Sequence, residues 1–111
     1  MAVYVANLVI NQGADFSQTF TLEDASTNAA KNLTGYSIDS KISKHHSSTN
    51  QTSFTATISN ASGGEIKLTL TDTQTNALAP GRQVYDVILT DPSGLKERVV
   101  EGMALVRDGV T

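Results

Sequence analysis

Cysteine and tryptophan are absent from this chain of 111 residues, and charged residues make up only 17% of it. Without cysteine there is no disulfide, no thiolate metal ligand and no cysteine nucleophile. The formal net charge is -3 at pH 7, with no run of lysine or arginine. Because neutralising a nucleic-acid backbone needs clustered cations, the composition argues against a nucleic-acid partner. The fold must be stabilised by its core alone.

The N-terminal segment is apolar but lacks the parts of a targeting signal. Residues 1–10 contain no positively charged start, and the polar pair Asn11 and Gln12 ends the apolar run early. The run is too short for a membrane span or a complete signal peptide. We therefore expect a first β-strand here, in a soluble protein that is made in a cytoplasm and has no membrane partner.

Alternation of apolar and hydroxyl-bearing residues dominates the sequence and is typical of half-buried strands. For example, Ile66, Leu68 and Leu70 alternate with lysine and threonine. Seven strands are predicted, at residues 3–10, 15–23, 36–43, 53–59, 65–71, 82–90 and 95–107. One short helical turn is expected at residues 72–78, with Asp72 as its cap.

Seven short strands in a chain of this length predict a single domain spanning residues 1–111. The fold class is all-β, an immunoglobulin-like antiparallel β-sandwich with one short helical turn. The runs at 82–90 and 95–107 are apolar on both faces, so we expect central strands or strands with a covered outer face. Gly102 interrupts the last run, and we expect a β-bulge there.

No combination of residues predicts a catalytic or cofactor site. The two histidines, His45 and His46, are adjacent in the hydrophilic segment 44–52, where a catalytic base would lack a rigid orientation. A metal site would need further converging ligands. Glu97 and Glu101 fall on one face of a predicted strand, and we interpret them as a solvated surface rather than a pair of catalytic acids. We predict a protein that is not an enzyme and has no cofactor or metal.

The most apolar stretches lie near the two ends of the chain. Residues 3–10 are more apolar than an exposed edge strand should be, and residues 99–106 share this property. In one interpretation the two strands pair with each other or are central in the core. In the other, one of them extends a sheet into another subunit or a larger assembly. The candidate interaction residues are Val3, Tyr4, Val5, Leu8, Val9 and Ile10.

The order of the segments resembles a known family. Residues 11–44 (NQGADFSQTFTLEDASTNAAKNLTGYSIDSKISK) place an apolar-aromatic strand and a loop before the NLTGY motif at 32–36. Residues 63–106 follow with a strand, a short helical turn, Pro-Gly and two long strands. This order resembles the small immunoglobulin-like domains of tailed-phage virions, in particular the N-terminal domain of phage baseplate upper proteins. The resemblance covers about residues 10–107, and its motifs encode turns and core strands rather than a site.

The resemblance implies a non-catalytic virion structural protein that acts as an adaptor in the tail, baseplate or fibre-attachment region. Its partners would be other virion structural proteins and further copies of itself, in a virion assembled after synthesis in the host cytoplasm. The alternative is a capsid decoration (cement) protein on the phage head. A carbohydrate-binding β-sandwich module is less favoured, because such modules stack sugars on exposed aromatic rings and aromatic residues form only 5% of this chain.

Overall fold

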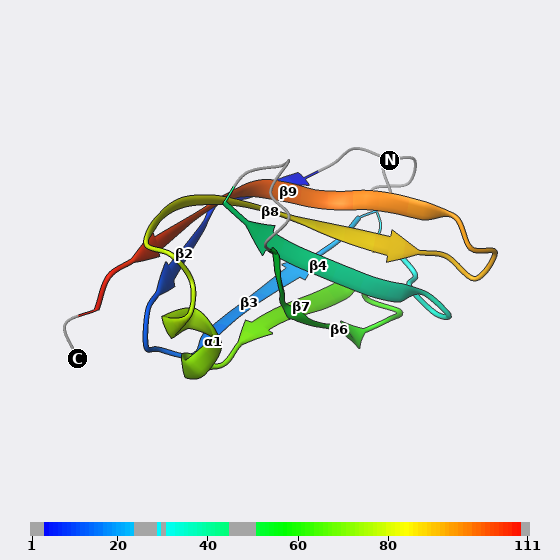
Figure 1. Cartoon of the computed structure of the whole chain (residues 1–111). Coiled ribbons are helices and arrows are strands. Elements are labelled where there is room, and N and C mark those ends of the chain that lie inside the picture. The colour runs from blue at the N-terminus through cyan, green and yellow to red at the C-terminus, as the bar shows by residue number, and fades with distance from the viewer. Residues whose placement is uncertain (1–3, 24–28, 30, 45–50, 110–111) are drawn as a thin grey trace.

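The computed structural model describes residues 4–23, 29, 31–44 and 51–109, which form two packed β-sheets and one short helix, α1 (Asp72–Asn76) (Figure 1). The larger sheet contains β1 (Tyr4–Val5), β2 (Leu8–Asn11), β4 (Ser37–Ser43), β5 (Gln51–Ser53), β8 (Gly81–Thr90) and β9 (Lys96–Arg107). The smaller sheet contains β3 (Phe16–Thr21), β6 (Thr55–Asn60) and β7 (Glu65–Leu70). Helix α1 follows β7 at one end of the sandwich.

The strand order confirms the predicted immunoglobulin-like sandwich. The larger sheet has the order β1-β9-β8-β4-β5, with β2 also paired to β9, and the smaller sheet has the order β3-β7-β6. The pairings are antiparallel except those of β1 and β2 with β9, which are parallel. The two apolar terminal runs therefore pair with each other, and β9 is a central strand between β2 and β8.

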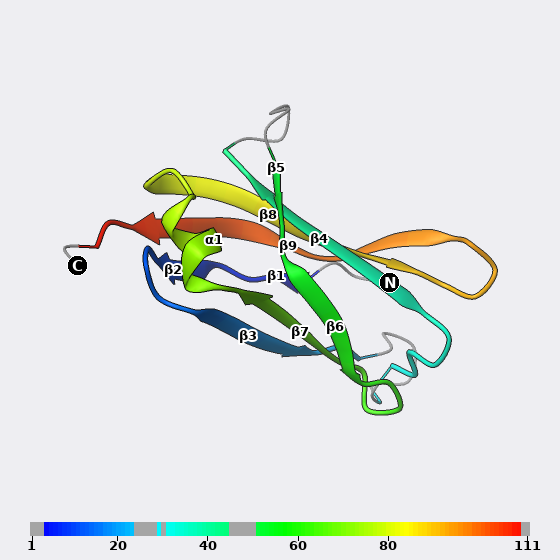
Figure 2. The same cartoon turned by 60° about the horizontal axis from the view of Figure 1, so that its bottom comes forward.

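The chain passes from one sheet to the other at Phe54. Strand β5 pairs with β4 in the larger sheet, and β6 pairs with β7 in the smaller one. Figure 2 shows β5 running directly into β6. Phe54 lies between them, is 5% exposed, and donates its backbone N–H to the Ser40 carbonyl at 3.0 Å. The single strand predicted at 53–59 is therefore two strands that close one side of the sandwich.

The core forms where the apolar faces of the two sheets meet. The residues that alternation assigned to the inside are buried or pack against the buried cluster. Phe54 lies at the aromatic centre, with its ring centroid 5.9 Å from that of Phe16 and 6.1 Å from that of Tyr85. The buried hydrophobic residues are Leu8, Ile10, Leu22, Leu33, Ile42, Phe54, Ile66, Leu68, Leu70, Leu78, Tyr85, Val87, Leu89, Val99, Val100, Ala104 and Val106.

The bulge in β9 lies at Val99, so the prediction of a bulge at Gly102 was wrong. Val100 pairs with Val87 but Arg98 pairs with Ile88, which leaves Val99 as the extra residue. An extra residue shifts the alternation of inward and outward side chains by one position. Val99 and Val100 are therefore both fully buried, although they are consecutive. Gly102 keeps regular pairing and has another role that depends on the N-terminal strand.

Helix α1 is capped by Thr71 and not, as expected, by Asp72. The Thr71 hydroxyl accepts from the Gln74 backbone N–H at 3.2 Å, and the Gln74 side chain accepts from the Thr71 N–H at 2.9 Å. This reciprocal pair is a capping box. Asp72 is the first helical residue, where its carboxylate accepts from the Thr73 N–H at 2.7 Å.

Candidate functional site

The N-terminal interaction residues alternate between the core and the surface. Val5 is 75% exposed and Val9 is 53% exposed, whereas Leu8 and Ile10 are buried in the core. Tyr4 belongs to β1, where its backbone pairs beside Val100. The remaining candidate, Val3, lies outside the described residues. Among the candidate residues whose side chains the structure describes, Val5 and Val9 are therefore exposed to solvent, on the outer face of the larger sheet.

Strand β9 adds two exposed apolar side chains to this face. Met103 is 41% exposed and Leu105 is 48% exposed, and the parallel register places Leu105 directly beside Val9. We call Val5, Val9, Met103 and Leu105 the β2–β9 patch. Sequence reasoning did not assign Met103 and Leu105 to a surface. The sequence does contain a signal for this exposure. Residues 103–106 are apolar at every position, and a strand can direct only alternate side chains toward the core.

Charged residues border the patch. Arg98 lies 3.5 Å from an Asp86 carboxylate oxygen and 3.6 Å from one of Glu101, in a network that crosses β8 and β9. Glu101 also pairs with Val5 in the parallel register of β1. An apolar centre beside a rim of charges is the arrangement found in protein–protein contact surfaces.

A break at Ala6 and Asn7 separates β1 from β2 and sets the position of the patch. The Ala6 N–H donates to the Glu101 carbonyl at 3.0 Å, but the Ala6 carbonyl accepts from the Tyr85 hydroxyl at 2.5 Å. The Met103 N–H, which a regular parallel ladder would direct to that carbonyl, donates to the Asn7 side-chain oxygen at 3.2 Å instead. Two side chains thus replace one backbone hydrogen bond, and the strand resumes at Leu8.

Tyr85 and Gly102 accommodate the break between β1 and β2 in the sheet. Burial raises the pKa of the Tyr85 hydroxyl to about 12, so the group stays protonated and donates at neutral pH. A Cβ atom at Gly102 would collide with the carbonyl oxygen of Ala6. Glycine at this position therefore allows the backbone of the N-terminal strand to approach β9 closely.

The acidic pair of the sequence prediction does not form. Glu97 pairs with Leu89, whose side chain is buried on the inner face, while Glu101 pairs with Asp86 on the outer face. The bulge at Val99 separates the two acids onto opposite faces, which corrects the expectation that they share one. The histidine pair, His45 and His46, lies outside the described residues.

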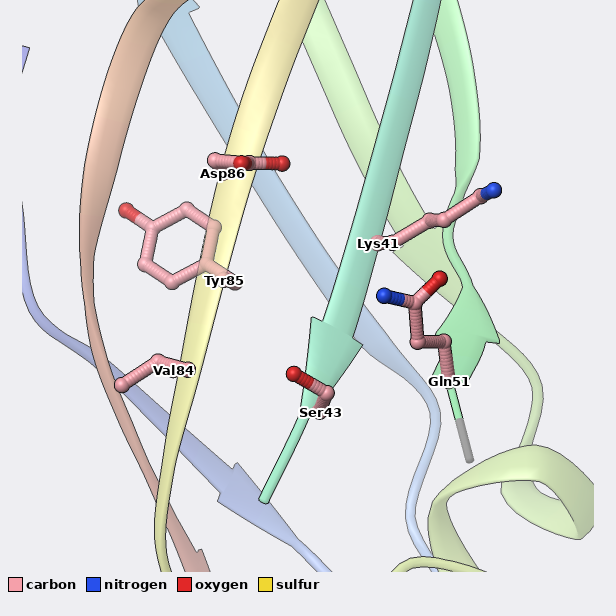
Figure 3. A pocket seen from close by; sticks show the side chains of 6 residues that line it. All are labelled: Lys41, Ser43, Gln51, Val84, Tyr85 and Asp86. Carbon is pink, nitrogen blue, oxygen red and sulfur yellow. The ribbon is translucent and has the colours of Figure 1, made fainter. Parts of the chain in front are cut away.

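A small hollow lies between β4, β5 and β8, and Figure 3 shows the side chains around it. It is lined by Lys41, Ser43, Gln51, Val84, Tyr85 and Asp86. Its volume is about 60 Å³, well below the roughly 300–1,000 Å³ of small-molecule pockets. The space suits water rather than a ligand.

A larger hollow of about 320 Å³ opens beside the turn between β8 and β9. It is lined by Lys31, Tyr36, Asp91, Leu95, Lys96 and Glu97. The Lys31 ammonium lies 5.7 Å from the centre of the Tyr36 ring and 3.9 Å from a Glu97 carboxylate oxygen. These contacts within the chain already compensate its charge. At Lys31 the hollow therefore presents an ion pair to the solvent rather than an unpaired cation.

The turn beside this hollow is ordered by Asp91. Its carboxylate accepts from the Ser93 hydroxyl at 2.7 Å, from the Ser93 N–H at 3.0 Å and from the Leu95 N–H at 2.9 Å. The hydrogen bond from the Ser93 hydroxyl, followed by that from the Leu95 amide, holds the pKa of Asp91 below its usual value. Residues 91–94 (Asp-Pro-Ser-Gly) therefore form a turn, and the Asp91 carboxylate stabilises that turn itself.

Within residues 4–23, 29, 31–44 and 51–109, no three histidine, aspartate or glutamate residues gather closely enough to hold a metal ion. No helix in the part of the chain that the structure describes has the length and apolar character needed to cross a membrane. The β2–β9 patch is the surface feature that favours binding to another molecule, because removing its exposed apolar side chains from water lowers the free energy.

Comparisons with known proteins give fold-level likenesses. No family model matches the chain, and no curated protein matches its sequence. Among solved structures, the Listeria monocytogenes internalin-like protein lmo2027 is similar, with a TM-score of 0.46 and 14% identity over 96% of this chain and 28% of that one. A structure from photo-crosslinking analyses of multimeric cell-adhesive interactions of VGSC beta subunits has a TM-score of 0.46 and 12% identity, over 96% of this chain and 93% of that one. This chain thus spans less than a third of the internalin-like protein, and the fold assignment rests on the strand order described above.

Proposed function

We propose that this chain is a non-catalytic structural protein of a tailed-phage virion, an adaptor that works through protein–protein contacts in the tail, baseplate or fibre-attachment region. The observation that carries the proposal is the β2–β9 patch, whose four apolar side chains are each more than 40% exposed. Grouped exposure of large apolar side chains is typical of interaction surfaces. The resemblance of residues 11–44 and 63–106 to phage virion domains directs this binding role to a virion.

The sandwich suits an adaptor for a physical reason. The patch lies on a central strand, β9, and on β1 and β2 beside it. Buried residues such as Ile10 and Val106 anchor β2 and β9. A surface held by a packed sheet is already in its bound conformation, so binding costs little ordering entropy. In a particle with many copies, modest individual contacts add up to firm attachment through avidity.

Localisation in purified particles tests the proposal. We expect mass spectrometry of particles from the phage that encodes the chain to find it, and labelled antibody imaged by electron microscopy to place it on the tail or baseplate. Copies on the head shell would instead identify the alternative, a capsid decoration protein. Absence of the chain from intact particles, with the protein abundant in the lysate, would overturn both.

A matched pair of variants tests the role of the patch. Leu105→Glu places a charge in the patch, while Thr57→Glu places the same charge on an exposed position of the smaller sheet. We expect Leu105→Glu to lower incorporation into particles about tenfold or more, since a buried unpaired charge costs several kcal/mol. Thr57→Glu should incorporate like the unchanged chain. Equal incorporation of the two variants would exclude the patch as the contact surface.

A further inference from the structure

The outer edge of β2 carries backbone groups without a partner among the described residues. The backbone N–H groups of Ala6 and Gln12 both donate to β9. In a parallel ladder, alternate residues direct both backbone groups to the same side, so the even-numbered residues face β9. The N–H and C=O groups of Val9 therefore point away from β9, toward the free edge of the sheet. The N–H groups of Asn7 and Asn11 point the same way.

Of the features that usually block strand addition, β2 has shortness, with four residues, but neither charge nor proline. Natural edge strands are protected by charged side chains, by proline, by bulges or by shortness. Strand β2 reads Leu8-Val9-Ile10-Asn11, with neither charge nor proline, and its register with β9 is regular. At the opposite edge of the larger sheet, β5 has three polar residues and passes at once into the other sheet. Strand β2 is therefore the longer and the more apolar of these two edges.

We propose that β2 pairs antiparallel with β2 of a second copy of the chain, joining the two larger sheets into one continuous sheet across a twofold axis at Val9. Centring the pair on Val9 places Val9 opposite its own copy and Asn7 opposite Asn11 on both sides. The outward backbone groups of Val9 then form the central hydrogen-bonded rung of an antiparallel ladder. In the flanking rungs, the Asn11 carbonyl already accepts from the Ala14 N–H at 3.2 Å and takes the Asn7 N–H of the other copy on its second lone pair. The edge is thus self-complementary, as a twofold interface requires.

The side chains on the outer face of the paired sheets are also complementary between the two copies. The central row of the pair reads Leu105, Val9, Val9 and Leu105, with both leucines placed by the parallel register of β2 and β9. Two amides, Asn7 and Asn11, face each other in the flanking rows, and amides can donate and accept across such a rung. The charges of Arg98 and its partners lie outside these rows, and Arg107, which lies beside Asn11 in the flanking rows, is exposed. The pairing covers apolar surface without burying a charge.

Self-pairing of the isolated chain does not depend on the assignment of the chain to a virion. A ladder centred on a strand of four residues buries less surface than the roughly 1,200 Å² of a stable standard interface. We therefore expect weak self-association in solution, which becomes firm where copies are held close together. If an extended segment of another protein occupies this edge instead of a second copy, the purified chain stays monomeric and Val9→Cys shows no excess crosslinking.

A single-cysteine variant tests the geometry directly, because the natural chain has no cysteine. In Val9→Cys, the new thiol lies opposite its own copy at a Cα separation of about 5.5 Å for a hydrogen-bonded antiparallel pair. This separation falls inside the range of about 4.4–6.8 Å that a disulfide spans. Under mild oxidation we expect a disulfide-linked dimer on a non-reducing gel, with a yield that rises with protein concentration.

Two control variants separate the proposed register from chance collisions. Thr19→Cys is exposed on β3, the edge strand of the smaller sheet, and Asn11→Cys is exposed on β2 but lies opposite Asn7. We expect Val9→Cys to form about tenfold more dimer than either control, because only its thiols are held together. Equal crosslinking of the three variants would overturn the proposal.

The mass of the chain in solution provides a second measurement that needs no cysteine. We expect sedimentation velocity to show a dimer increasing up to about 1 mM protein, a range suited to a small interface. Val9→Lys should remain monomeric with an unchanged melting temperature, because Val9 is 53% exposed and lysine protects edge strands. A chain that is monomeric throughout, with no excess crosslinking at Val9→Cys, would show that this edge does not bind a second copy.

Discussion

The hydroxyl of Tyr85 donates a hydrogen bond of 2.5 Å to the carbonyl oxygen of Ala6, which lies 79 positions earlier in the chain. Tyr85 comes from β8 and is 3% exposed. The bond reaches past β9 to the point where the N-terminal strand breaks into β1 and β2. This buried hydroxyl group therefore links the core to the break that precedes β2.

Removing that hydroxyl is expected to destabilise the fold. Tyr85→Phe leaves the ring in the core but deprives the Ala6 carbonyl of its donor, so we expect a loss of about 1–3 kcal/mol in the free energy of unfolding. Tyr36→Phe is the matched control, since the Tyr36 hydroxyl makes no hydrogen bond with the described residues. Urea denaturation compares the two variants, and equal stability would show that the bond to Ala6 contributes nothing.

Alkaline pH should weaken the same contact. Burial raises the pKa of Tyr85 from about 10 in an unfolded chain to about 12 in the folded one. The stabilisation by this group is therefore complete below pH 10 and is lost as the pH rises toward 12, because the unfolded chain ionises first. Urea midpoints at pH 9 and pH 11.5 should show the advantage of the natural chain over Tyr85→Phe shrinking. A constant difference across this range would contradict the assignment.

Adding one methyl group at Gly102 tests the close approach of the N-terminal strand. The Cβ atom of Gly102→Ala would collide with the backbone of Ala6, and such overpacking costs about 1–3 kcal/mol. We expect faster hydrogen exchange at the Ala6 and Gln12 amides, which donate to β9. Met103→Ala, a neighbouring exposed position, should leave both exchange rates unchanged. Unchanged exchange in Gly102→Ala would mean that the strand does not pack against that glycine.

A core substitution tests the alternation on which the fold prediction depends. Leu70 is 2% exposed and Leu105 is 48% exposed, so Leu70→Ala should cost about 2–5 kcal/mol through the cavity it leaves. Leu105→Ala should change the free energy of unfolding by no more than about 0.5 kcal/mol. Thermal unfolding of both variants measures the difference, and similar melting temperatures would contradict the assignment of faces.

The sequence predicted the features that neighbouring residues determine. Alternation identified the inward-facing Ile66, Leu68 and Leu70, all buried, because side chains of a strand point to opposite faces in turn. The glycine of the NLTGY motif, Gly35, likewise lies before the next strand with a positive φ of 82°, which glycine adopts readily. Such features depend on local backbone preferences, which a single sequence displays.

Contacts between distant segments determine the features that the sequence did not reveal. The break after Val5 requires the hydroxyl of Tyr85, and nothing near Val5 signals it. The bulge at Val99 moves Glu97 to the other face, although the alternation around it reads as regular. In the runs that are apolar on both faces, period alone could not decide which side is exposed, so Met103 and Leu105 became visible as surface residues only in the structure.

The sequence and the structure assign the cap of helix α1 to different residues, and substitution of each residue tests the assignment. Thr71→Ala removes the hydroxyl that accepts from the Gln74 N–H, and we expect a loss of about 1 kcal/mol, typical of a lost N-cap. Asp72→Ala removes a carboxylate at the first helical position, where the helix dipole contributes about 0.3–1 kcal/mol at most.

The helix matters to the whole fold because its buried Thr75 hydroxyl donates to the Ala14 carbonyl at 2.9 Å and accepts from the Gly13 N–H at 3.2 Å. These bonds fix the turn between β2 and β3, so fraying of the helix should also loosen the β2 edge. Chemical denaturation of both variants, with hydrogen exchange at Gly13, measures this effect. A larger loss in Asp72→Ala than in Thr71→Ala would return the capping role to Asp72.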